Sequence, residues 1–292
     1  MASAAEWIEG IRVRTLPAAT SPVLAGTGVA WFAGGFQPLL AALSLVVALA
    51  IQIGSNLAND FSDGIRGTDA HRVGPQRLVG SGAATPHQVL GAALGFFGLA
   101  CAVGVVVAWL IGAWWLLAVG AACIVAAWFY TGGKRPYGYH GLGEIFVFVF
   151  YGLVAVIGTV YVQVGALGPA AWWTAVAIGA LTVLILIANN LRDIDGDREA
   201  GKLTLATRLG DARTRWFFVG TTVVAFAGVF IVALTSTWWA LLGWVGVAML
   251  VHPAWQVARG LKGFPLVGVL KRTGIGELVC AVGLLVGLVI GS

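Results

Sequence analysis

The chain has 292 residues, of which 59% are hydrophobic and only 10% are charged, and its formal net charge at pH 7 is +5. About a quarter of the residues in a soluble domain are charged. This composition therefore excludes an ordinary soluble globular protein and indicates a polytopic membrane protein. The three cysteines lie inside apolar runs without CxxC spacing or a nearby histidine, so a disulfide framework and a cysteine-based metal site are also excluded.

Nine apolar stretches of roughly 17–23 residues, the length needed for a helix to cross a bilayer, follow one another along the chain. They lie at about 16–33, 39–59, 88–110, 112–130, 144–163, 171–190, 214–235, 237–257 and 274–291. Pro17 and Pro22 kink or shorten the first stretch. The sequence predicts an all-α membrane protein with nine transmembrane helices, forming a single domain over residues 1–292.

Charged side chains occupy alternate connections between these stretches. With nine spans, all 17 Lys and Arg lie in the N-terminal tail and in the loops after the second, fourth, sixth and eighth spans. Because basic loops remain on the cytoplasmic side, the pattern predicts a cytoplasmic N-terminus in a multi-pass protein of the cell (inner) membrane. We expect the 12 Asp and Glu to share that face, which predicts an active site facing the cytoplasm.

An acidic motif follows the second span, with the sequence Asn56-Leu57-Ala58-Asn59-Asp60-Phe61-Ser62-Asp63. If the helix continues through it, Asn56, Asp60 and Asp63 project from one face, because they are four and three residues apart. An ionised group at membrane depth costs ~2.5–3.5 kcal/mol on insertion. A shared cation would offset this cost.

A second acidic motif follows the sixth span, with the sequence Asn189-Asn190-Leu191-Arg192-Asp193-Ile194-Asp195-Gly196-Asp197-Arg198-Glu199. Asp193 and Asp197 are four residues apart and are expected on one helical face. Four spans separate the two motifs, which places both on the same side and suggests an internal duplication. Oxygen ligands without His or Cys suit Mg²⁺, which binds through a few carboxylates plus substrate phosphates, so we expect a diphosphate partner. The alternative is a set of solvated acids beyond two helix ends.

Basic residues share the predicted cytoplasmic face and could take up the charge of a departing diphosphate. These are Arg66, Arg72, Arg77, Lys134, Arg192, Arg198 and Lys202. Each could instead serve only as a topology determinant. The spacing of Tyr130 and Lys134 predicts a phenol and an ammonium on one helical face. Glu144 heads the fifth span and is either functional or simply favoured at a helix N-terminus.

These motifs closely resemble those of the UbiA superfamily of intramembrane aromatic prenyltransferases, over essentially the whole chain. The motifs that carry the resemblance are Asn56-x-x-Asn59-Asp60-x-x-Asp63, Tyr130-x-x-x-Lys134 and Asp193-x-x-x-Asp197. The sequence around these motifs most resembles the branch of the superfamily that acts on 1,4-dihydroxy-2-naphthoate in menaquinone biosynthesis. The runs in question are 12–17, 74–79, 141–144 and 192–206. One departure is Gly67, which stands where the family often has a third Asp, and Asp69 is the nearest acid.

The resemblance implies a UbiA-type bundle and a Mg²⁺ cofactor. It implies transfer of the polyprenyl group of an all-trans polyprenyl diphosphate to 1,4-dihydroxy-2-naphthoate with loss of CO₂, giving demethylmenaquinone and diphosphate. The metal ligands would be Asp60, Asp63, Asp193 and Asp197, with Asn56, Asn59 and Asp69 assisting. Lys134, Arg77 and Lys202 would stabilise the leaving diphosphate. Further substrate contacts would come from Tyr130, Arg192, Glu144 and Arg14.

Three other interpretations remain open. The acceptor could be 4-hydroxybenzoate, homogentisate or a tetrapyrrole, because the acceptor-binding residues are not evident from the pattern. A carrier or channel could also have nine helices, but its acids are expected near the midplane in interrupted helices. A protein that merely binds quinones would not need both aspartate pairs. The lipid bilayer is an expected partner, and nucleic acid is not.

Overall fold

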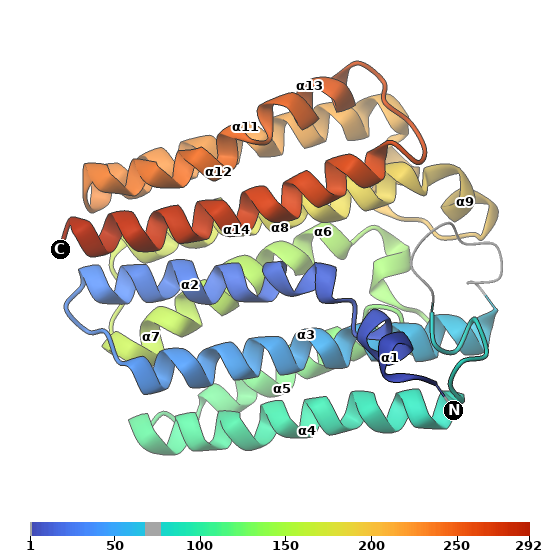
Figure 1. The fold of residues 1–292 in the computed structure, drawn as a ribbon, viewed down its shortest axis with the longest axis horizontal. Coiled ribbons are helices and arrows are strands. Elements are labelled where there is room, and N and C mark those ends of the chain that lie inside the picture. Colours follow the sequence, from blue (N-terminus) through green and yellow to red (C-terminus); the bar gives the residue numbers. More distant parts are fainter. Residues whose placement is uncertain (1, 68–76) are drawn as a thin grey trace. The chain divides into compact units, whose positions relative to one another are not determined.

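The computed structural model describes residues 2–67 and 77–292. The chain divides into two compact units, one made of Met1–Leu16 and Val46–Tyr139, the other of Pro17–Leu45 and His140–Ser292. Every regular element among the described residues is helical, which confirms the predicted all-α class (Figure 1). That the whole chain forms a single domain stays a prediction.

The first unit contains the acidic motif that follows the second predicted span. Its elements are α1 (Ala4–Gly10), η1 (Val13–Thr15), α3 (Pro38–Arg66) from residue 46 onward, α4 (Pro86–Ile111), α5 (Leu116–Phe129) and η2 (Tyr137–His140) up to residue 139. The helix α4 starts at a capping box, in which Thr85 and Gln88 bond each other's backbone amides, and it packs against α5. Leu57 of α3 packs with Leu78 and Phe97 in the buried core of this unit.

The second unit is built around the long helix α8 (Pro169–Arg192). Its other elements are α2 (Leu16–Phe32) from residue 17 onward, residues 38–45 of α3, α6 (Gly143–Val147), η3 (Phe148–Ile157), α7 (Gly158–Val164), α9 (Ile194–Glu199), α10 (Leu205–Leu209), α11 (Asp211–Thr235), η4 (Trp238–Gly243), α12 (Trp244–Ala248), α13 (Val251–Ala258) and α14 (Leu266–Ile290). The helix α8 packs against η3, α11 and α14 (Figure 1). Gly152 and Gly179 let η3 approach α8 closely, since a Cβ built on Gly152 would lie 2.7 Å from the Gly179 Cα.

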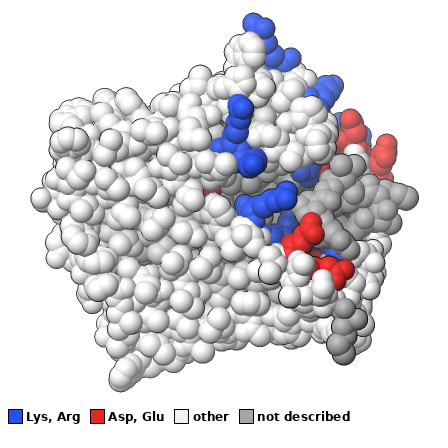
Figure 2. All heavy atoms as spheres, in the orientation of Figure 1, with Lys and Arg blue, Asp and Glu red and all other residues white. Residues whose placement is uncertain are grey.

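Several helices are long and apolar enough to cross a membrane. In the described residues there are six, namely α3, α4, the continuous stretch Gly143–Val164, α8, α11 and α14. The bent pair Trp238–Ala248 and Val251–Ala258 would add a seventh, while α5 is shorter, with 14 residues. Most of the surface in view carries neither acidic nor basic side chains (Figure 2). The protein is therefore a multi-pass membrane protein, and nine spans stay a prediction.

The last helix differs from the expectation. It begins at Leu266 rather than at about residue 274, so Lys271 and Arg272 lie inside the helix and not in a loop. Glu277 then falls in the middle of α14, where it is fully buried and its Oε1 accepts a hydrogen bond of 2.7 Å from the Thr182 hydroxyl of α8. The prediction placed Glu277 near the start of the last span, whereas it lies in the middle of α14, because the helix already begins before Lys271 and Arg272.

Candidate active site

The first motif lies on the last turns of α3, in the first unit. The helix continues to Arg66, as expected, so Asn56, Asp60 and Asp63 share one face. All three are buried, with exposed fractions of 3%, 1% and 3%. Buried carboxylates need partners that offset their lost hydration. The contacts of each side chain therefore indicate what it can do.

The Asp60 carboxylate binds the backbone that follows the 68–76 segment. Its Oδ2 accepts a hydrogen bond of 2.7 Å from the Leu78 amide, and its Oδ1 accepts one of 3.1 Å from the Val79 amide. Val79 packs against Gly64 one turn further along α3, where a Cβ would lie 2.4 Å from a Val79 side-chain atom. Asp60 thus holds the backbone that directly follows Arg77 against the end of α3.

The Asp63 carboxylate contacts a tyrosine hydroxyl and an arginine guanidinium. Its Oδ1 accepts a hydrogen bond of 2.6 Å from the Tyr139 hydroxyl, and its Oδ2 lies 3.4 Å from the Nη2 of Arg77. Burial, followed by the nearby Asp63 charge, raises the pKa of Tyr139 above its usual value. The phenol therefore stays neutral at physiological pH and remains a hydrogen-bond donor to the carboxylate.

Hydrogen bonds connect the loop after α5 to the end of α3. The Thr131 hydroxyl donates a hydrogen bond of 2.7 Å to Asn59 Oδ1. The Arg66 guanidinium donates to the carbonyl oxygens of Thr131 and Gly133. The loop that carries Lys134 is therefore hydrogen-bonded to the end of α3, where the predicted site residue Asn59 lies.

Tyr130 and Lys134 do not lie on one helical face, so that part of the prediction is wrong. The helix α5 ends at Phe129, and Tyr130 follows as its cap. The backbone leaves helical geometry at Gly132 and Gly133, and Gly133 has a φ of 75°. Two adjacent glycines end a helix readily because glycine adopts positive φ without steric cost. Lys134 is exposed in the turn, and Tyr130 packs edge-on against the Tyr137 ring.

Asn56 connects the N-terminal segment to α3. Its Nδ2 donates hydrogen bonds to the Ile11 carbonyl at 3.0 Å and to the Thr15 hydroxyl at 2.9 Å, while its Oδ1 accepts one of 3.2 Å from Gln52. Arg14, a predicted substrate contact, is exposed in the η1 turn, which these hydrogen bonds hold against α3. A metal-binding role for Asn56 stays a prediction, and the structure gives this residue a support role as well.

The second motif lies in the second unit, where α8 ends and α9 begins. The helix breaks at Asp193, yet the Asp197 amide donates to the Asp193 carbonyl at 2.8 Å, so the two residues remain one turn apart. Arg192 donates to both oxygens of Asp193, at 2.7 and 2.5 Å, and also to Asn189 Oδ1 at 3.0 Å. The Lys202 amide donates to the Asp197 carbonyl at 2.8 Å, closing the turn after α9.

Glu144 is buried beside this motif in the second unit. Its Oε1 accepts a hydrogen bond of 2.9 Å from the Asn190 side chain. Its Oε2 is buried and has no hydrogen-bond partner among the described residues. Buried polar groups are usually hydrogen-bonded, and Asn190 gives Glu144 such a partner. A functional role of Glu144 stays a prediction.

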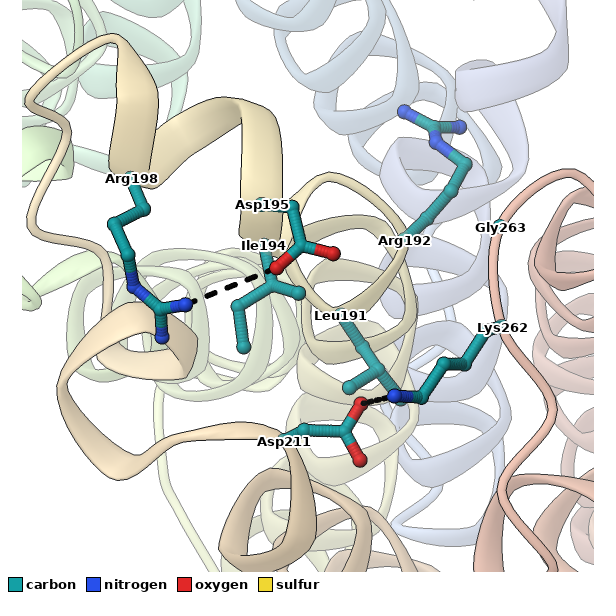
Figure 3. Close-up of a pocket in the computed structure, with 8 residues that line it drawn as sticks. All are labelled: Leu191, Arg192, Ile194, Asp195, Arg198, Asp211, Lys262 and Gly263. Carbon is teal, nitrogen blue, oxygen red and sulfur yellow. Dashed lines mark ion pairs between the residues drawn. The ribbon is translucent and has the colours of Figure 1, made fainter.

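A polar pocket of about 260 Å³ opens beside the second motif, also within the second unit (Figure 3). It is lined by Leu191, Arg192, Ile194, Asp195, Arg198, Asp211, Lys262 and Gly263. Arg198 lies 3.7 Å from Asp195 and Lys262 lies 3.9 Å from Asp211, with 60% and 73% of the two basic side chains exposed (Figure 3). Such long, exposed ion pairs stabilise little, so both cations can still attract an anion.

The donor atoms of both motifs fit Mg²⁺. They are carboxylate and amide oxygens, the ligand type that this hard cation prefers. Among the described residues, no group of three or more His, Cys, Asp or Glu gathers that could hold an ion. Mg²⁺ usually binds through a few carboxylates and completes its coordination with water or phosphate oxygens. Asp69 and Arg72 lie outside the described residues.

Comparison with known proteins decides the family. A family model described as the UbiA prenyltransferase family matches residues 19–263. The chain belongs to this family. The 1,4-dihydroxy-2-naphthoate octaprenyltransferase of Mycobacterium tuberculosis is 50% identical over 292 residues, which cover 100% of this chain and 99% of the relative. The protein of the same name from Escherichia coli is 38% identical over 286 residues, covering 94% and 91% of the two chains.

The UbiA family fold is also evident in solved structures. A UbiA homologue from Archaeoglobus fulgidus, solved with GPP and Mg²⁺ bound, superposes with a TM-score of 0.70 over 98% of this chain and 99% of its own. The two sequences are 14% identical, so this likeness concerns the fold. In this UbiA chain, sequence reasoning missed Thr131, Tyr139 and the pocket residue Lys262. No local spacing connects the first two to Asn59 and Asp63, which lie more than seventy residues earlier.

Proposed function

We propose that this chain is a Mg²⁺-dependent prenyltransferase that transfers a polyprenyl group from an all-trans polyprenyl diphosphate to 1,4-dihydroxy-2-naphthoate. The observation that carries the proposal is the pair of aspartate motifs, each held beside an arginine, Asp63 with Arg77 and Asp193 with Arg192. The full-length identity to relatives named for this activity supports the same substrates.

In this proposal both motifs supply oxygen ligands, Asp60, Asp63 and Asn59 from the first and Asp193 and Asp197 from the second. Asn56 and Asp69 complete the proposed oxygen donors of the first motif. Bound Mg²⁺ would supply positive charge that stabilises the departing diphosphate. The aspartates hold their oxygens in place for this cation because their own hydrogen bonds to Leu78, Tyr139 and Arg192 fix the carboxylates.

The basic residues have a matching role. Arg77, Lys134, Arg192 and Lys202 bind the diphosphate oxygens and take up negative charge as the allylic C–O bond breaks. The bonding electrons leave with the diphosphate, and the allylic cation remains in an apolar interior that excludes water. The electron-rich ring carbon that carries the carboxylate attacks this cation. Loss of CO₂ returns the electrons to the ring and gives demethylmenaquinol, the reduced form of demethylmenaquinone.

Tyr130, Arg14 and Glu144 are the remaining proposed substrate contacts. Arg14 offers an exposed guanidinium to the acceptor carboxylate, and the buried Oε2 of Glu144 offers a hydrogen-bond acceptor to a ring hydroxyl. Tyr130 contributes an aromatic wall beside Tyr137.

We further propose that the chain works as one domain with nine spans and a cytoplasmic N-terminus, in the cell (inner) membrane. The short helices α2 and α5 would supply two spans beyond the six long ones and the bent pair. The alternation of charged and uncharged loops supports the orientation. The site would then face the cytoplasm, where a soluble aromatic acid arrives, while the polyprenyl tail stays in the bilayer.

The test is prenyl transfer by the detergent-purified protein supplied with an all-trans polyprenyl diphosphate and one aromatic acid. The acids are 1,4-dihydroxy-2-naphthoate, 4-hydroxybenzoate and homogentisate, each with Mg²⁺ or with EDTA. We expect Mg²⁺-dependent product from the naphthoate alone. Product from one of the other acids alone would keep the chemistry and overturn the acceptor. Absence of product from every acid, with a folded protein, would overturn the proposal.

A further inference from the structure

Two tyrosines in the short η2 segment have different partners. The Tyr137 hydroxyl donates to the backbone carbonyl of Ala126 at 2.8 Å, a contact within the scaffold. The Tyr139 hydroxyl donates instead to the Asp63 carboxylate at 2.6 Å. The Arg66 guanidinium also lies over the Tyr139 ring, 5.9 Å from its centre. The Tyr139 hydroxyl therefore bonds to the aspartate motif, whereas the Tyr137 hydroxyl bonds to the backbone of α5.

Asp63 stands where two faces of α3 meet. Asn56, Asp60 and Asp63 form the first face, which carries the aspartate pair. Asn59, Asp63 and Arg66 form the neighbouring face at the same spacing. Every residue of that second face contacts the loop 131–139, through Thr131, Tyr139 and the carbonyls at 131 and 133. Asp63 is the one residue that belongs to both faces.

The hydrogen bond from Tyr139 orients the Asp63 carboxylate. At 2.6 Å it is much shorter than the 3.4 Å contact from Arg77 to the other carboxylate oxygen. A short hydrogen bond from a neutral hydroxyl to a carboxylate is among the stronger kinds, and it fixes the orientation of the acceptor. Because Lys134 lies in the loop that Tyr139 ends, the same bond links the position of this cation to Asp63.

We propose that Tyr139 is a positioning residue, which orients Asp63 for cation binding and fastens the loop of Lys134 to the first motif. The inference rests on the proposed function, in which Asp63 is a Mg²⁺ ligand. Groups that hold a metal ligand from behind typically change metal affinity or activity 10–100-fold when they are removed. Loss of the Tyr139 hydroxyl should therefore weaken cation binding without removing a ligand.

The test compares Tyr139→Phe with Tyr137→Phe in the full-length, detergent-purified protein. Mn²⁺ is titrated as the probe, and bound ion is measured by electron paramagnetic resonance in the absence of substrate. Asp63→Asn identifies the class of bound Mn²⁺ that depends on the first motif. For that class, Tyr139→Phe should raise Kd by about 10-fold or more, whereas Tyr137→Phe should stay close to wild type. Thermal unfolding of each variant checks that the protein is folded.

Turnover provides a second readout. In Tyr139→Phe, the Mg²⁺ concentration for half-maximal rate should rise, while the acceptor KM stays unchanged. Tyr139→His keeps an N–H donor and should recover part of the lost Mg²⁺ affinity. Wild-type Mn²⁺ binding in Tyr139→Phe, or an equal effect in Tyr137→Phe, would overturn the inference while leaving the proposed function intact. Wild-type protein that neither binds Mn²⁺ nor transfers prenyl groups would overturn both.

Discussion

Asn190 and Glu144 are joined by a buried hydrogen bond of 2.9 Å, which connects the end of α8 to the start of α6. Asn190 belongs to the second motif, so this bond links Glu144, a proposed acceptor contact, to the helix end that carries Asp193. The second carboxylate oxygen of Glu144 is buried beside it. The two oxygens of Glu144 therefore differ, because one accepts the bond from Asn190 and the other has no hydrogen-bond partner among the described residues. Substitutions can test a structural and a chemical role separately.

We predict that Asn190→Ala lowers the free energy of unfolding by about 1–3 kcal/mol, because it leaves the Glu144 carboxyl buried without its donor. Glu144→Gln keeps an oxygen that accepts from Asn190 and should unfold close to wild type. If Glu144 contacts the acceptor, the same variant should raise the acceptor KM. Thermal unfolding and steady-state kinetics measure the two effects, and a wild-type KM in Glu144→Gln would contradict the substrate role.

Asp60 supports the backbone as well as the proposed cation. Asp60→Ala removes the acceptor of the Leu78 and Val79 amides, so we predict a loss of about 1–3 kcal/mol in unfolding free energy. Asp60→Asn keeps one carbonyl oxygen and should lose less stability while losing the charge. Comparing the thermal unfolding of the two variants checks this. Equal stability of both variants and the wild type would show that the Asp60 bonds contribute nothing to the fold.

Glu277 and Thr182 form a hydrogen bond between α14 and α8 inside the second unit. Such bonds between membrane helices contribute about 0.6 kcal/mol on average and at most about 1.7. We predict that Thr182→Val costs a stability in this range, whereas Glu277→Gln is nearly neutral because its amide oxygen still accepts. Both substitutions should leave the rate of prenyl transfer unchanged. A large rate loss in Glu277→Gln, with normal unfolding, would instead give this buried carboxyl group a functional role.

Short-range patterns predicted the first motif well, because helical periodicity alone places Asn56, Asp60 and Asp63 on one face. The same reasoning misplaced Lys134, since a spacing of four has meaning only while the helix continues, and Gly132 and Gly133 end it. The contact between Asp63 and Tyr139 joins residues 76 positions apart, and only tertiary structure brings them together. The start of the last helix was misplaced because Lys271 and Arg272 were assigned to the loop before it, whereas α14 begins at Leu266.

The central claim is that both aspartate motifs serve one metal-dependent transfer. The most direct measurement is the rate of prenyl transfer to 1,4-dihydroxy-2-naphthoate by purified Asp60→Asn, Asp193→Asn and the control Asp195→Asn. Asp195 is a matched control because it lies in the second motif with 88% of its side chain exposed. We predict that the first two variants lose about 100-fold or more in rate, because a metal ligand should matter more than the groups that hold ligands in place, whose loss costs about 10–100-fold, while the control remains near wild type. Near-normal turnover in folded Asp60→Asn or Asp193→Asn would contradict the account.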